Sequence, residues 1–93
     1  AINAYSANAS SVNQVMEHFT KKQRQLITRL LEKKDGINVE EIIELLNAQN
    51  VKNSQNYVQA HIYRLRNKLH RLLGNDYIIT YKKHTYQLLC IHR

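Results

Sequence analysis

The chain has 93 residues, 43% of them hydrophobic and 23% charged, a size and composition that fit one folded domain and exclude two. Its formal net charge is +7, and residues 52–93 hold all of this excess, with eight Lys and Arg against the single acid Asp76. Such an asymmetry favours a polyanionic partner, nucleic acid before a membrane surface.

Residue usage disfavours several other classes of protein. The apolar runs are too short for a membrane span, and the first residues lack the pattern of a signal peptide. Cys90 is the only cysteine, so no intrachain disulfide can form, and its apolar surroundings predict a buried thiol. The five histidines lack metal-ligand spacing, and the sequence contains no nucleophile–base set or Gly-rich phosphate loop. We therefore expect no metal, no cofactor and no enzymatic activity.

Secondary structure is weakly indicated at the start of the chain and clearly indicated from Thr20 onward. Residues 1–14 are small and polar, which leaves open a linker or one short N-terminal strand. Because the chain begins at Ala1 without Met, we interpret it as a piece cut from a longer protein. The folded domain is expected over residues 15–93. Its first helix is expected over residues 21–33, after the N-cap Thr20.

Two further helices are predicted in the middle of the chain. The second is expected from its N-cap Asn38 to about residue 47, followed by an amide-rich loop over residues 47–55. The third is expected over residues 54–73, with Ser54 as its N-cap. A stripe at spacings of three and four marks the buried face of this helix: Val58, Ile62, Leu65, Leu69 and Leu72.

After Gly74 the apolar pattern changes to the alternation of strands, which predicts a β-hairpin over residues 77–91 with a basic tip at residues 82–84. Three helices followed by a C-terminal β-hairpin wing are typical of the winged helix-turn-helix, an α+β fold, here with at most a small N-terminal sheet. In that fold the third helix (54–73) enters the major groove of DNA. The wing (80–86) reaches the adjacent backbone or the minor groove.

The exposed face predicted for the third helix combines Arg and amide side chains with one aromatic ring. Arg can bond bidentately to guanine, and Asn or Gln to adenine, while a small residue lets the helix approach the groove floor. The alternative is a solvated basic surface, which is the commoner role of a basic helix face; the lack of Asp and Glu in residues 53–75 narrows the gap between it and a DNA-reading face. The face consists of Asn56, Ala60, Tyr63, Arg64, Asn67 and Arg71, with Gln59 at its edge.

A family resemblance rests on three motifs. Residues 58–69, VQAHIYRLRNKL, resemble the V-D-V-H-I-x-R-L-R-x-K-L signature of the OmpR/PhoB-type effector domains of two-component response regulators. Residues 19–27 are similar to their L-T-x-x-E-x-x-L-L helix start, and residues 78–88 to their wing, I-x-T-x-R-G-x-G-Y-x-L. The match covers residues 19–88 in the same order; the helix motif is fairly specific, and the other two are weak alone.

The resemblance implies roles for positions on the third helix. Arg64 would read a base, and Gln59 replaces the Asp of the family at a groove-facing position. Asn56 and Tyr57 stand where Arg-Thr is usual, among backbone and base contacts. Arg66 would contact a phosphate.

The resemblance also implies partners and a wing contact. Lys82 would be the cation of the wing, with Lys83 beside it, and His61 matches a family histidine that we interpret as a packing residue. The loop at residues 47–53 corresponds to a surface that contacts RNA polymerase in some members. The full-length protein would bind tandem half-sites on double-stranded DNA as a homodimer, in the bacterial cytoplasm and away from the membrane.

The chain departs from the family at the wing, where Lys83, His84 and Thr85 replace G-x-G, so its turn must differ. The changed helix positions mean that the DNA sequence preferred by the family cannot be carried over. Two alternative functions stay open. One is a winged helix that binds acidic proteins without specific DNA binding. The other, less supported, is an RNA-binding module, since no aromatic strand platform or G-x-x-G loop is evident.

Overall fold

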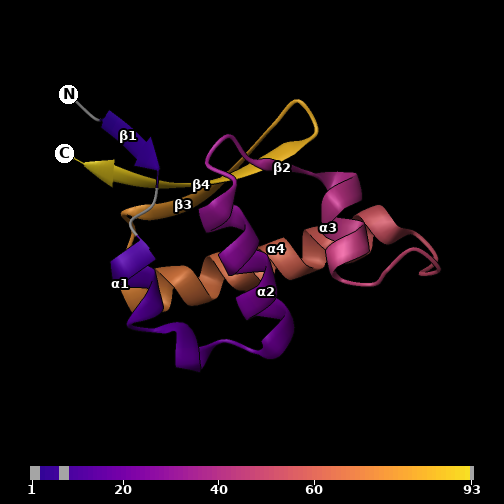
Figure 1. The fold of residues 1–93 in the computed structure, drawn as a ribbon, viewed down its shortest axis with the longest axis horizontal. Helices are drawn as coiled ribbons and strands as arrows, with labels where there is room; N and C mark the ends of the chain where they lie inside the picture. The colour runs from indigo at the N-terminus through magenta and orange to yellow at the C-terminus, as the bar shows by residue number, and fades with distance from the viewer. Residues whose placement is uncertain (1–2, 7–8, 93) are drawn as a thin grey trace.

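The computed structural model describes residues 3–6 and 9–92, which form a sheet with helices packed on one side of it (Figure 1). The predicted α+β winged helix-turn-helix is confirmed: its three helices are α2, α3 and α4, and its wing is the β3–β4 hairpin. The elements in chain order are β1 (Asn3–Ser6), α1 (Ala9–Asn13), a 3-10 turn (Met16–His18), α2 (Lys21–Glu32), β2 (Ile37–Asn38), α3 (Val39–Leu45), α4 (Ser54–Leu73), β3 (Tyr77–Lys82) and β4 (Thr85–His92).

The N-terminal segment takes part in the fold. Strand β1 pairs antiparallel with the end of β4, in a register that sets Asn3 opposite His92 and Ser6 opposite Leu89. Helix α1 was not predicted, because one apolar residue among small polar ones has no helical period. Its Val12 is nevertheless completely buried. The packed core therefore begins upstream of residue 15.

Strand β4 is the centre of the sheet. It pairs with β3 from Cys90 opposite Tyr77 to Thr85 opposite Lys82. Its other edge is shared by β1 near its end and by β2 near its start. The two residues of β2 are too few to produce a visible alternation, so the sequence did not predict this strand. The wing is consequently anchored to the chain that enters α3.

The predicted starts of the first two helices are confirmed. The Thr20 hydroxyl accepts from the Gln23 backbone N–H at 3.2 Å, and the Gln23 side chain accepts from the Thr20 N–H at 2.9 Å. This reciprocal capping box satisfies two N–H groups that have no partner within the helix. At α3, the Asn38 side chain accepts from the Glu41 N–H at 2.8 Å. The two helices end one and two residues earlier than predicted.

The N-cap predicted for the third helix is wrong. Ser54 is the first helical residue of α4, and the cap position is taken by Asn53, whose side chain makes no capping hydrogen bond. Asn53 has a left-handed backbone with φ 59°, so the chain enters α4 from a turn rather than from the extended conformation of an ordinary cap. Gly74, with φ 81°, is the C-cap at the other end.

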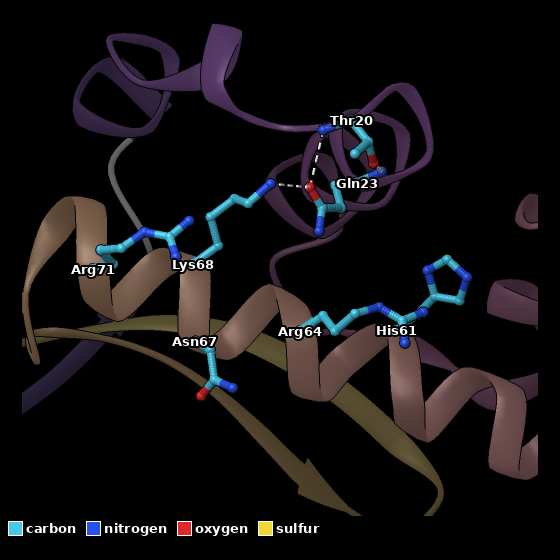
Figure 2. Close-up of a pocket in the computed structure, with 7 residues that line it drawn as sticks. All are labelled: Thr20, Gln23, His61, Arg64, Asn67, Lys68 and Arg71. Atoms are coloured by element: carbon cyan, nitrogen blue, oxygen red, sulfur yellow. Dashed lines mark hydrogen bonds between the residues drawn. The ribbon is translucent and has the colours of Figure 1, made fainter.

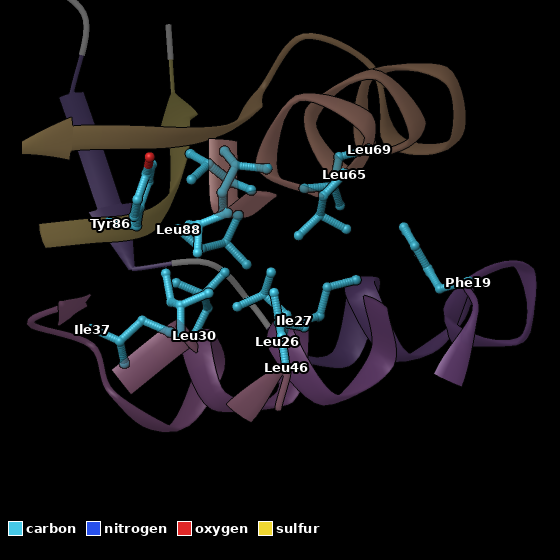
Figure 3. Close-up of a cluster of buried hydrophobic side chains, with 14 of the residues drawn as sticks. Phe19, Leu26, Ile27, Leu30, Ile37, Leu46, Leu65, Leu69, Tyr86 and Leu88 are labelled. Atoms are coloured by element: carbon cyan, nitrogen blue, oxygen red, sulfur yellow. The ribbon is translucent and has the colours of Figure 1, made fainter. Parts of the chain in front are cut away.

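One hydrophobic core lies between α4, the other helices and the sheet. Four residues of the apolar stripe predicted for α4 are buried, since Val58, Ile62, Leu65 and Leu69 are at most 1% exposed. The fifth, Leu72, is half-buried against the same core. Figure 3 shows Leu65 and Leu69 above the side chains that α2 contributes to the same cluster. The thiol of Cys90 is also buried. The rotation of α4 about its axis is thus fixed by the residues that it buries.

Gly36 joins α2 to β2 at a position that only glycine fits. Its φ is +100°, and an added Cβ would lie 2.7 Å from the Tyr86 carbonyl oxygen and 2.6 Å from Thr85 Cγ2. Gly74 also has a positive φ, but a Cβ there would meet nothing within 4 Å. Both glycines therefore have a positive φ, but only Gly36 lacks room for a Cβ.

We expect Gly36→Ala to lower the free energy of unfolding by about 2 kcal/mol or more, because backbone strain and a clash with main chain act together. Gly74→Ala is the matched control and should lose only about 1 kcal/mol from strain. Urea denaturation of both variants measures the difference. Equal losses would show that the approach of β4 to Gly36 is not tight.

Candidate nucleic-acid interface

The face of α4 opposite its buried stripe is open to solvent. Tyr63 is the large hydrophobic side chain exposed on it, at 65%. No acid lies on the helix, so the face presents only cationic, amide, apolar and aromatic groups. Seven predicted contact residues are exposed: Asn56, Gln59, Ala60, Tyr63, Arg64, Asn67 and Arg71.

Tyr57 lies at the border of this face and is half-buried. Its hydroxyl accepts from Lys22 Nζ at 3.1 Å, and the same ammonium lies 5.8 Å from the ring centroid. The edge of its ring meets His61 at a centroid distance of 4.7 Å. Tyr57 therefore joins α4 to the first turn of α2. Only the part of its ring that stays exposed is available to contact a ligand.

A basic groove separates the start of α2 from α4. Its volume is about 500 Å³, and Figure 2 shows Arg64 and Arg71 of α4 beside it. None of its lining side chains is acidic, so the groove is suited to an anion such as a backbone phosphate. It is lined by Thr20, Gln23, His61, Arg64, Asn67, Lys68 and Arg71.

Lys68 holds the two walls of the groove together. Its ammonium donates to Gln23 Oε1 at 3.0 Å and to the His18 carbonyl at 3.1 Å, and lies 5.6 Å from the centroid of the Phe19 ring. Gln23 Oε1 thus accepts from Lys68 and from the Thr20 N–H at once (Figure 2). The capping box of α2 is extended to α4. Sequence reasoning assigned Lys68 no role.

Arg66 has a different environment from the one that the resemblance implied. Its Nε and Nη2 donate to the Ile79 carbonyl at 3.0 and 2.8 Å, and the side chain is half-buried. These bonds tie α4 to β3 on the flank away from α2. We therefore assign Arg66 to the junction of helix and sheet and leave it out of the proposed contact set.

His61 is half-buried on the α2 side of the helix. Burial lowers the pKa of His61, and the positive charges of Arg64 and Lys22 lower it further. The imidazole is accordingly neutral at neutral pH. A neutral ring against Tyr57 adds apolar contact without adding to the positive charge of the groove.

The wing ends in a two-residue turn, as short as an antiparallel hairpin allows. Lys83 and His84 both have left-handed backbones, with φ 52° and 64°, so the turn has the positive φ values of type I′ without a glycine. Lys82 and Lys83 are exposed at this tip. The turn was expected to differ from the glycine turn of the family, and it is a two-residue turn with positive φ at Lys83 and His84.

His84 fastens the tip to α3. Its Nε2 lies 2.8 Å from Glu40 Oε1, and its carbonyl accepts from the Val39 N–H at 3.2 Å. The hydrogen bond from His84 lowers the pKa of Glu40, which stays ionised at neutral pH. These contacts offset the strain of a left-handed residue that is not glycine. They fix the backbone of the tip from which the side chains of Lys82 and Lys83 extend.

The geometry defines a winged-helix domain whose α4 has an exposed basic face. A family model for the C-terminal domain of transcriptional regulatory proteins matches residues 14–88. The chain belongs to this family, the OmpR/PhoB-type effector domains of response regulators, and is a DNA-binding domain of a transcriptional regulator, a class without enzymatic activity. Searches of curated proteins and of solved structures each found no match.

Within residues 3–6 and 9–92, no three His, Cys, Asp or Glu side chains are grouped so that they could hold a metal ion. Among the helices of this part of the chain, none has the length and apolar character that crossing a membrane requires.

Proposed function

We propose that the chain binds double-stranded DNA sequence-specifically as the effector domain of a bacterial transcription regulator. Helix α4 lies in the major groove, and the β3–β4 wing lies on adjacent backbone or in the minor groove. The acid-free face of α4, with the basic groove on one flank, carries this proposal. Access to the chromosome places the regulator in the bacterial cytoplasm.

The contacts divide by chemistry. Arg64 is exposed on α4, where its planar guanidinium can bond bidentately to guanine O6 and N7. The amides of Asn56, Gln59 and Asn67 suit adenine. Arg71 lies toward the end of α4 in the basic groove, where a phosphate of the same DNA strand can be bound.

The wing contributes charge rather than base recognition. Lys82 and Lys83 carry compact ammonium groups on flexible stems, which neutralise phosphate without a fixed geometry. Base-reading and charge-neutralising residues can therefore be separated by experiment, since only the latter act equally on every sequence.

Arg64→Ala is expected to weaken binding to a duplex selected from a random pool by about 1–3 kcal/mol and to relax preference at one base pair. Replacing both Lys82 and Lys83 by Gln is the matched comparison. It should weaken binding to selected and random duplexes alike and reduce the salt slope by about one to two. Gel titrations over a range of salt concentrations measure both effects.

Two outcomes would count against these assignments. Equal losses on selected and random duplexes would make Arg64 a phosphate contact. An unchanged salt slope in the double Lys variant would mean that the wing tip does not touch DNA.

Assembly is proposed to occur on the DNA. The large apolar side chains of the described residues are mostly buried, and the net charge of +7 opposes self-association. The family resemblance implies a full-length homodimer in head-to-tail order on tandem half-sites. We therefore infer that the 93-residue chain is monomeric alone and that two copies bind one face of the duplex.

Half-sites about 10–11 base pairs apart should bind two copies cooperatively, and inserting about five base pairs should abolish cooperativity by rotating one copy to the opposite face. Sedimentation of the chain without DNA, with gel titrations on both spacings, measures this. A stable dimer without DNA, or cooperativity at both spacings, would contradict the proposal.

The turn before α4 is proposed as the RNA polymerase contact. Within residues 47–53, Val51 is 38% exposed and its N–H donates to the carbonyl of the buried Ala48 at 3.1 Å. An apolar side chain is thereby presented on a fixed turn. Val51→Ala should reduce activated transcription in a reconstituted system and leave duplex affinity unchanged. A parallel loss of both, or of neither, would contradict this role.

A further inference from the structure

We propose that Tyr81 on the wing strand is a further DNA contact, whose ring packs on the sugar–phosphate backbone that runs between α4 and the wing. This inference rests on the proposed function and adds a residue to it. Sequence reasoning gave Tyr81 no role, because it occupies an unspecified position of the wing motif.

Strand alternation directs Tyr81 toward α4. Side chains two residues apart share a face of a strand, and on β3 this face carries Tyr77 and Ile79, which are 8% and 5% exposed. Tyr81 is the next residue on that face, yet it is 52% exposed. Tyr81 lies just beyond the edge of the core. At this point the face of the sheet that packs on the helices becomes open to solvent.

The ring is supported from behind. Tyr81 stands directly opposite Tyr86 of β4, and the two rings have a centroid distance of 4.7 Å at an interplanar angle of 47°. Tyr86 is only 5% exposed, so Tyr81 packs on a buried neighbour and presents its other face to solvent. Such support reduces the rotamer freedom that would be lost on binding.

A second exposed tyrosine, Tyr63, lies on α4 and is 65% exposed. Arg66 joins α4 to β3 at Ile79, which locates the point where helix and strand meet. The short turn at residues 74–76 reverses the chain. The strand β3 therefore runs back along α4 in the opposite direction. Tyr63 precedes Arg66 by about one helical turn and Tyr81 follows Ile79 by two residues, so both are displaced from the Arg66–Ile79 contact in the same direction. Both tyrosines therefore lie on the wing side of the contact between Arg66 and Ile79.

The charges of the wing tip and of α4 select the partner. Tyr81 is followed by Lys82 and Lys83 at the tip, and α4 carries no acid. An exposed ring on a strand that ends in a cationic tip matches the backbone of DNA, where the apolar face covers a deoxyribose and the charges of the tip neutralise nearby phosphates. Because sugars are the same at every base pair, the contact adds affinity without adding sequence preference.

The test compares Tyr81→Ala and Tyr81→Phe on a selected and on a random duplex. Tyr81→Ala should weaken binding to both by about five- to tenfold, and Tyr81→Phe should keep most of the affinity, since it keeps the ring. The salt slope should equal that of the unchanged chain, unlike the slope of the double Lys variant. Thermal melting of both variants establishes that they are folded under the conditions of the titration.

A direct readout uses the absence of Trp from the sequence. Tyr81→Trp introduces a single Trp, which can be excited apart from the remaining tyrosines, and its emission should be quenched and shielded from acrylamide when the random duplex is added. Val51→Trp, on the turn before α4, is the matched control and should respond to acrylamide equally with and without DNA.

The possible outcomes distinguish a failure of the Tyr81 contact from a failure of the proposed DNA-binding function. If the unchanged chain binds no duplex, the proposed function fails and the contact with it. If binding is present and sensitive to Arg64, but Tyr81→Ala binds normally, only the Tyr81 contact is overturned. It is also overturned if Tyr81→Phe loses as much as Tyr81→Ala, or if the Trp at position 81 stays equally accessible on DNA.

Discussion

The apolar stripe of α4 can be buried in only one rotational setting of the helix, and this setting decides which of its polar side chains reach solvent. Two basic residues hold the setting from opposite flanks: Lys68 bonds to the capped start of α2, and Arg66 bonds to the Ile79 carbonyl of β3. Arg64 and Arg71 stay exposed. Basic residues of one helix are thus divided between internal ties and a surface that is free to bind.

The tie through Lys68 also explains why a glutamine is buried. Gln23 is 8% exposed, and its Oε1 accepts two hydrogen bonds, one within the capping box and one from Lys68. A buried polar group is tolerated when it is bonded in this way. The start of α2, the turn before it and the middle of α4 therefore form one polar unit, and the basic groove is built on it.

Periodic burial made the main elements predictable: α2, α3, α4 and the hairpin follow from apolar spacing, and the buried side of α4 is as expected. Elements too short to show a period were missed, as α1 and β2 illustrate. The cap at Ser54 was misassigned because the preceding Asn53 adopts a left-handed backbone, which a sequence does not specify. Likewise, the partner of Arg66 is a main-chain carbonyl thirteen residues away, and only the tertiary fold brings it into reach.

The same bond has a consequence for how the sheet meets other chains. The backbone carbonyl of Asp76 accepts from the Ile91 N–H, so by alternation the even-numbered residues of β3 bond to β4, and the Ile79 carbonyl faces the outer edge. Among the described strands β3 pairs only with β4, which makes it an edge strand. Edge strands with free carbonyls invite pairing with a second molecule. Arg66 occupies the Ile79 carbonyl with two of its N–H donors, so a strand added at this edge would have to displace the guanidinium to bond there.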